Sequence, residues 1–165
     1  MVSHFAYLKS LKGSYRVEFE SLFDDYGILA VQGPAAWKIL FETCGLKAPF
    51  SSTPESFTFW KDCELLGKKV MLGITGYTGE IGCEVFVRTN DLPFVFKNLV
   101  EKGAALGLKP VGLGARDTLR TEMGYSLYGH ELTESINPVE AGLSWAIGWK
   151  KENFKGKAAL DAAKA

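Results

Sequence analysis

The stretch from Gly73 to Val87 constrains the fold of this chain more than any other. An apolar run over residues 70–74 leads into a turn that holds three glycines within seven residues. After the turn, small or β-branched apolar residues occupy every second position, which is the period of a strand with one buried face. Glycines permit positive φ angles and let backbone or ligand come close. The stretch therefore predicts two strands joined as a wide hairpin.

Two interpretations of the polar residues in this hairpin stay open on local pattern. The alternation directs Glu84 away from the face that Val85 buries. With Tyr77 in the turn, the Glu84 carboxylate could form one wall of a small-molecule pocket. Local pattern alone favours the simpler interpretation, a hairpin whose Glu84 is merely solvated.

The rest of the chain alternates helical and extended patterns. Helical spacing of apolar residues predicts helices over residues 3–11, 34–44 and 92–103. Strand-like runs occur at residues 15–19, 28–31, 57–66, 69–74, 83–88 and 108–113. Of these, residues 28–31 are continuously apolar and predict a central strand. The order favours an α+β fold, an antiparallel sheet with helices packed on one face, similar to a ferredoxin-like sandwich.

The pattern changes near residue 113. We therefore divide the chain into an α+β core over residues 1–113 and a helix with an extended segment over residues 114–165. Arg116 and Arg120 lie one turn apart on the predicted helix. Spacing alone favours a solvated or ion-paired surface for both arginines. His130 is most simply a loop histidine, and Trp145 is most simply a core aromatic.

Composition excludes several classes of function. Nineteen basic and nineteen acidic side chains balance to zero, and no basic tract or long apolar segment is present. We therefore expect no nucleic-acid partner and no membrane partner. The three cysteines are isolated and predict reduced thiols in a cytoplasmic setting. With two histidines, a metal site is not expected.

Several motifs occur together in one order. They are Ala30–Pro34, Thr75–Glu80 with Gly82 and Glu84, Gly112–Arg120, Leu127–Gly129, Pro138–Trp145 and Gly156–Lys157. Together they resemble the aminomethyltransferase (T protein) family of the glycine cleavage system. Any one motif would be weak, whereas the set in order is specific.

The resemblance implies a reaction and a set of contacts. Such proteins move a one-carbon unit from the aminomethyl-lipoyl arm of the H protein to tetrahydrofolate, releasing ammonia. By similarity, Glu84 and Arg116 hold the pterin, Tyr77 contacts its ring, and Trp145 lies close to the folate. A pterin presents an N–H beside an exocyclic amine, which a carboxylate accepts as a pair. No metal is implied.

The departures from the family also carry an expectation. The family's catalytic aspartate and its C-terminal β-barrel have no counterpart that we can match in this chain. The chain therefore resembles the central folate-binding portion of a longer protein, with no catalytic residue of its own and little or no activity alone. The alternatives are a non-catalytic folate-binding paralogue and the folate-binding tail of a dimethylglycine or sarcosine dehydrogenase-like protein.

Overall fold

The computed structural model describes residues 2–164, which form two compact units. The first unit reaches Gly76 and resumes from Ile81 to Lys109. The second unit combines Tyr77–Glu80 with the chain from Pro110 onward. The glycine-rich turn therefore contributes to both units.

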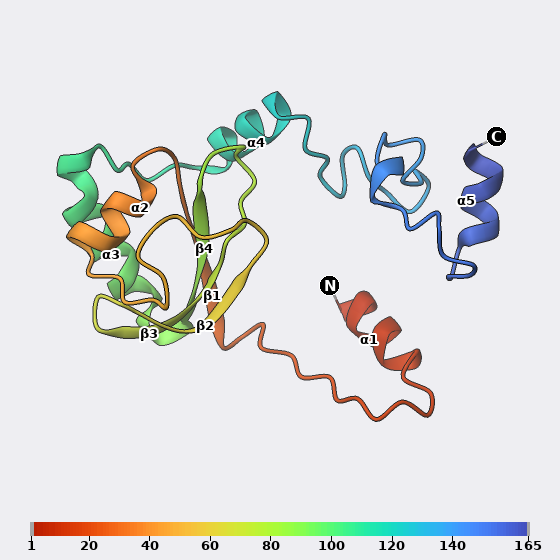
Figure 1. Ribbon diagram of the computed structural model, residues 1–165, viewed down its shortest axis with the longest axis horizontal. Coiled ribbons are helices and arrows are strands. Elements are labelled where there is room, and N and C mark those ends of the chain that lie inside the picture. Colours follow the sequence, from red (N-terminus) through yellow and green to blue (C-terminus); the bar gives the residue numbers. More distant parts are fainter. Residues whose placement is uncertain (1, 165) are drawn as a thin grey trace. The chain divides into compact units, whose positions relative to one another are not determined.

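The first unit is built on a four-stranded antiparallel sheet in the order β1-β4-β3-β2 (Figure 1). The strands are β1 (Tyr26–Gln32), β2 (Phe59–Leu65), β3 (Lys68–Gly73) and β4 (Gly82–Arg88). Strands β3 and β4 pair in register from Val70 opposite Val87 to Gly73 opposite Glu84. The predicted hairpin around the glycine-rich turn is confirmed.

One face of the sheet carries the core. Helices α2 (Ala36–Lys38) and α3 (Leu92–Gly103) contact β4, and the wide π-helical turn η1 (Ile39–Thr43) continues α2. Short 3₁₀ turns, η2 (Thr89–Asp91) and η3 (Ala104–Leu106), flank α3. Each strand sends alternate residues into this layer, which contains Val31, Cys63, Leu65, Val70, Leu72, Cys83, Val85 and Val87. The predicted α+β class, with helices on one face, is confirmed.

Two predicted strands are absent, and a third is present but does not lie at the predicted central position of the sheet. Residues 15–19 are irregular because no neighbouring strand among residues 2–164 supplies their backbone hydrogen bonds, and the Tyr15 side chain is 73% exposed. Residues 28–31 belong to β1, which pairs with β4 alone among residues 2–164 and is therefore an edge strand in the described sheet. Residues 108–113 form no strand, and Leu113 begins a helix.

The second unit begins with helix α4 (Leu113–Glu122) and continues through a looped region. The 3₁₀ turn η4 (Ser144–Ala146) interrupts this region, and helix α5 (Lys157–Lys164) ends the described chain. At the other end, α1 (Val2–Ser10) confirms the helix predicted over residues 3–11.

Candidate ligand-binding site

Glu84 lies on the face of the sheet opposite the core. Cys83 and Val85, its neighbours along β4, are fully buried, whereas Glu84 is half-buried. Directly opposite Glu84 stand Ala30 of β1 and Gly73 of β3. Residues paired across antiparallel strands share a face, so the carboxylate is flanked by the two smallest side chains. Ala30 is exposed, so the side of the carboxylate toward β1 is open to a ligand, whereas the Thr75 and Phe86 side chains lie over Gly73.

Hydrogen bonds fix the carboxylate in place. The Thr75 hydroxyl donates to Oε2 of Glu84 over 2.5 Å. The segment that carries Thr75 is itself held by Gln32, whose amide Nε2 donates to the Thr75 carbonyl at 3.2 Å and the Cys83 carbonyl at 3.0 Å. A carboxylate has about four acceptor positions, so Glu84 keeps capacity for further donors.

Apolar side chains surround Glu84 on the same face. The next row of the sheet places Ile28 opposite Phe86 and Phe86 opposite Met71. Phe59 packs edge-to-face on Phe86, with ring centroids 5.6 Å apart. Ile28 is 54% exposed and Phe59 49% exposed, so this surface is open to a partner. One fixed carboxylate on an apolar, aromatic surface suits a flat heterocycle that carries donors.

The second unit brings Tyr77 and Arg116 together. The Arg116 guanidinium lies 4.6 Å from the centroid of the Tyr77 ring, in a cation–π contact. The Tyr77 ring also packs on Tyr125, with centroids 5.7 Å apart. Its hydroxyl donates to the carbonyl of Ser126. Arg116 is exposed, so its donors can reach a ligand.

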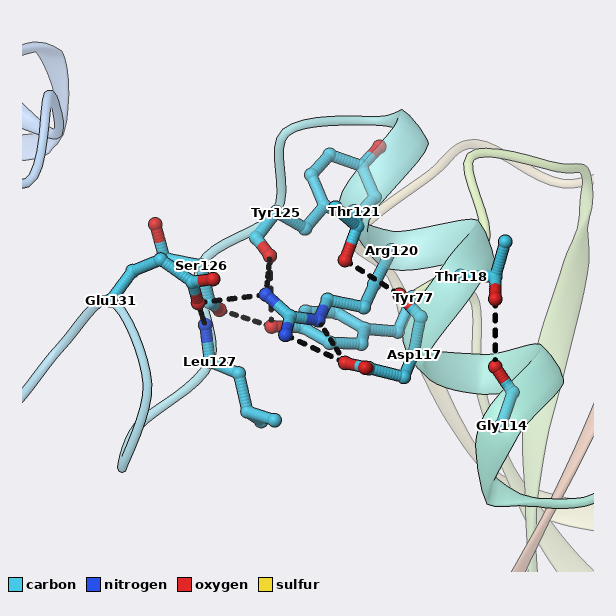
Figure 2. A network of polar contacts seen from close by, with 10 residues as sticks. All are labelled: Tyr77, Gly114, Asp117, Thr118, Arg120, Thr121, Tyr125, Ser126, Leu127 and Glu131. Atoms are coloured by element: carbon cyan, nitrogen blue, oxygen red, sulfur yellow. Dashed lines mark hydrogen bonds and ion pairs between the residues drawn. The ribbon is translucent and has the colours of Figure 1, made fainter.

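Arg120 has a different role from Arg116, although the two share a helix. Its side chain is only 5% exposed and sits between Asp117 and Glu131 (Figure 2). Nε donates to Asp117 Oδ1 at 2.8 Å, while Nη1 donates to Glu131 Oε2 at 2.7 Å and to the Tyr125 carbonyl at 3.2 Å. Glu131 Oε2 also accepts the Leu127 amide at 3.0 Å. Of the two interpretations, solvated or ion-paired, Arg120 is ion-paired, but its side chain is buried rather than at the surface.

The same network perturbs the charged groups in it. The hydrogen bond from Arg120, followed by that from the Leu127 amide, lowers the pKa of Glu131 to about 2 from an ordinary value of 4.5. The hydrogen bonds to Glu131 and Asp117 raise the pKa of Arg120. Glu131 therefore remains ionised well below the pH at which an unfolded glutamate is protonated.

We expect this lowered pKa to appear as acid sensitivity. Because the folded pKa of Glu131 lies below the unfolded one, its stabilising contribution is complete above pH 4.5 and is lost as pH falls toward 2. Circular dichroism during acid titration should show Glu131→Gln to be less stable than the wild type at neutral pH. The difference should shrink over the same pH window, whereas the exposed Glu122→Gln should follow the wild type. Parallel curves for Glu131→Gln and wild type would contradict this role.

Two other predicted residues lie at the surface. Trp145, within η4, is 81% exposed, so its simplest interpretation as a core aromatic is wrong. His130 is an exposed loop residue, as expected, whose backbone N–H donates to the Leu127 carbonyl at 3.0 Å. Both side chains are accessible to a ligand or partner.

Three further features concern residues 2–164, namely groups of metal-ligating side chains, the Cys83 thiol and the length of the helices. No cluster of three or more histidine, cysteine or acidic side chains there could hold a metal ion. Burial, with the nearby Cys63, raises the pKa of the Cys83 thiol to about 12, so Cys83 is a neutral core residue and a poor nucleophile. None of the helices in this range is both long and apolar enough to cross a bilayer.

Sequence reasoning predicts Glu84, Arg116 and Tyr77 as ligand contacts, but it did not predict the residues that hold these side chains. Thr75 and Gln32 fix Glu84 through contacts between segments distant in sequence, which no local pattern reveals. Asp117 and Arg120 have i, i+3 spacing, which does predict an ion pair. Glu131, eleven residues beyond Arg120, has no such signal.

Comparison with known proteins identifies the family. The model of the GCVT N-terminal domain matches residues 2–151. The chain belongs to this family, the aminomethyltransferase family of the glycine cleavage T protein. The family membership predicted from the sequence motifs is therefore confirmed.

Individual relatives support the same family membership. The aminomethyltransferase of Bdellovibrio bacteriovorus is 47% identical over 137 residues, covering 83% of this chain and 37% of the relative. That of Bacillus subtilis is 42% identical over 145 residues, covering 87% of this chain and 39% of the relative. The crystal structure of the glycine cleavage aminomethyltransferase T of Bartonella henselae superposes with a TM-score of 0.76 at 26% identity, covering 99% of this chain and 43% of that one. The chain spans about two fifths of the length of these proteins.

Proposed function

We propose that this chain supplies folate-binding residues of a tetrahydrofolate-dependent aminomethyltransferase of glycine cleavage. In the whole protein, the one-carbon unit would pass from the aminomethyl-lipoyl H protein to tetrahydrofolate, with release of ammonia. Family membership supports the transferase class. The observation that carries the folate assignment is Glu84, a fixed carboxylate between Ala30 and Gly73 on an open aromatic face.

The proposed roles follow from the chemistry of each side chain. Glu84 accepts hydrogen bonds from the N–H and exocyclic amine of the pterin, and Thr75 keeps the carboxylate oriented for them. Phe86 and Phe59 offer apolar contact beside it. Arg116 donates to acceptor groups of the folate, and Tyr77 offers it a ring contact. The exposed Trp145 is a further candidate contact.

None of these residues activates the folate for reaction. Each binds or orients, and the catalytic carboxylate of the family is not matched in this chain. We therefore propose that the isolated chain binds tetrahydrofolate without releasing ammonia from aminomethylated H protein. The H protein as partner and the cytoplasm as location belong to the same proposal.

Calorimetric titration of tetrahydrofolate into the chain tests this function. We expect saturable binding that weakens on Arg116→Ala by about 1.5–3 kcal/mol, the usual contribution of a charge-assisted hydrogen bond. Arg88→Ala is the matched control, because Arg88 is an exposed arginine that pairs with Asp25 and Tyr26. Absence of binding, or equal losses for both variants, would contradict the assignment.

A further inference from the structure

The position of Tyr77 is set by a loop of the same unit. Its hydroxyl donates to the Ser126 carbonyl and approaches the Tyr125 carbonyl at 3.5 Å. Its ring rests on the Tyr125 ring, tilted by 31°. Tyr125 and Ser126 therefore hold Tyr77 at its face and at its hydroxyl, and Figure 2 shows the contact of the hydroxyl with Ser126.

The loop is held in turn by Arg120 and Glu131. Arg120 donates to the Tyr125 carbonyl, the same carbonyl that the Tyr77 hydroxyl approaches. Glu131 accepts from Arg120 and from the Leu127 amide with one oxygen, Oε2. Both ends of residues 125–127 are thus tied to one buried guanidinium, which is fixed on its other side by Asp117. The planar fork of arginine suits this role, since it donates in several fixed directions at once.

We infer that Arg120 and Glu131 are positioning residues for Tyr77 and, through the Tyr77 ring, for Arg116. The Arg116 side chain is exposed and long, and its orientation in the free protein comes from its stacking on that ring. A guanidinium already oriented loses less side-chain entropy when it binds a ligand. The inference rests on the proposed function only in taking Tyr77 and Arg116 as ligand contacts. The chain of contacts itself does not depend on folate.

Glu131→Gln tests the positioning without any ligand, because it keeps the side-chain volume and removes the charge. The readouts are hydrogen exchange at the Leu127 amide and the NMR shift of the Arg116 side chain, which the ring current of Tyr77 displaces. We expect exchange at Leu127 at least tenfold faster and an Arg116 shift close to that in Tyr77→Ala. Glu122 is an exposed glutamate on α4, the helix that carries Arg116 and Arg120, and Glu122→Gln should leave both readouts unchanged. If Glu131→Gln folds and shows the wild-type exchange rate at Leu127 and the wild-type Arg116 shift, the inference is overturned.

Arg120→Lys is the second variant. It keeps a positive charge but loses the planar guanidinium that donates in several fixed directions. If Glu131→Gln fails to fold, Arg120→Lys should still give faster Leu127 exchange and a reduced Arg116 shift. A folded Arg120→Lys with wild-type values would overturn the inference equally.

Tetrahydrofolate titration then tests whether the positioning reaches the ligand. We expect Glu131→Gln to weaken tetrahydrofolate binding about tenfold when it is made in the wild-type chain. The loss should be much smaller when it is made in Tyr77→Phe, which already lacks the hydroxyl that bonds to Ser126. Equal losses in both backgrounds would overturn action through Tyr77. If the wild type binds no tetrahydrofolate, the proposed function fails, while exchange and NMR shifts still decide the positioning role.

Discussion

Gly82→Ala is expected to destabilise the chain by about 3 kcal/mol or more, since backbone strain and a steric clash add at this position. Gly82 has φ of +153°, a conformation that L-residues rarely adopt. A Cβ there would lie 2.2 Å from the Val31 carbonyl oxygen and 2.8 Å from the Gln32 Cα. Both obstacles are backbone atoms of β1, so relief requires the strands to separate where Gln32 pairs with Gly82.

Urea unfolding measures this effect. Gly114→Ala is the matched control, because a Cβ on Gly114 meets no atom within 4 Å and Gly114 lies inside helix α4. Alanine in a helix interior is expected to be neutral or to stabilise by up to about 1 kcal/mol. Equal stability of Gly82→Ala and wild type would show that β1 and β4 do not approach as described.

Glu84→Ala is expected to abolish most of the tetrahydrofolate affinity. Removing one partner of a desolvated, charge-assisted pair costs about 2–5 kcal/mol, a loss of about thirtyfold or more in affinity. Stability should change little, because Glu84 is half-buried and its one described hydrogen bond, from Thr75, is replaceable by water. Calorimetric titration checks the affinity, and urea unfolding checks the fold.

Glu101→Ala provides the control for this loss. Glu101 is an exposed glutamate on α3 that pairs with Lys97 at 3.8 Å. Exposed ion pairs of this kind contribute about 0–1 kcal/mol to stability. Its removal should leave the tetrahydrofolate affinity unchanged. A Glu84→Ala variant that binds as tightly as Glu101→Ala would remove Glu84 from the site.

Local periodicity was sufficient to predict a strand and the direction of its side chains where one face of the strand is buried. The alternation along β4 predicted that Val85 points into the core and Glu84 away from it, and the burial pattern confirms both. It was not sufficient for residues 15–19, because alternation makes a strand only where a neighbouring strand supplies hydrogen bonds. Residues 28–31 were apolar throughout, yet one face of β1 stays open at Ile28.

The surroundings of the candidate site depend on pairings between distant segments. Ala30 and Gly73 flank Glu84 only because β4 lies between β1 and β3, a strand order that no local signal specifies. Arg116 and Arg120 look equivalent from helical spacing. Burial separates them, and it comes from the loop that carries Glu131. Motifs pointed to Glu84, Tyr77 and Arg116, while the residues that orient them required the structure.

The most direct test of the role of Glu84 compares the affinities of pterin and lumazine for the wild type and for Glu84→Gln. Pterin carries an exocyclic amine where lumazine carries a carbonyl oxygen, so only pterin presents the donor pair proposed for Glu84. We expect the wild type to prefer pterin by about tenfold or more, as one charge-assisted hydrogen bond implies. In Glu84→Gln, whose amide can also donate, this preference should vanish or reverse. An unchanged preference in Glu84→Gln would contradict the account, because the donor pair would then bind elsewhere.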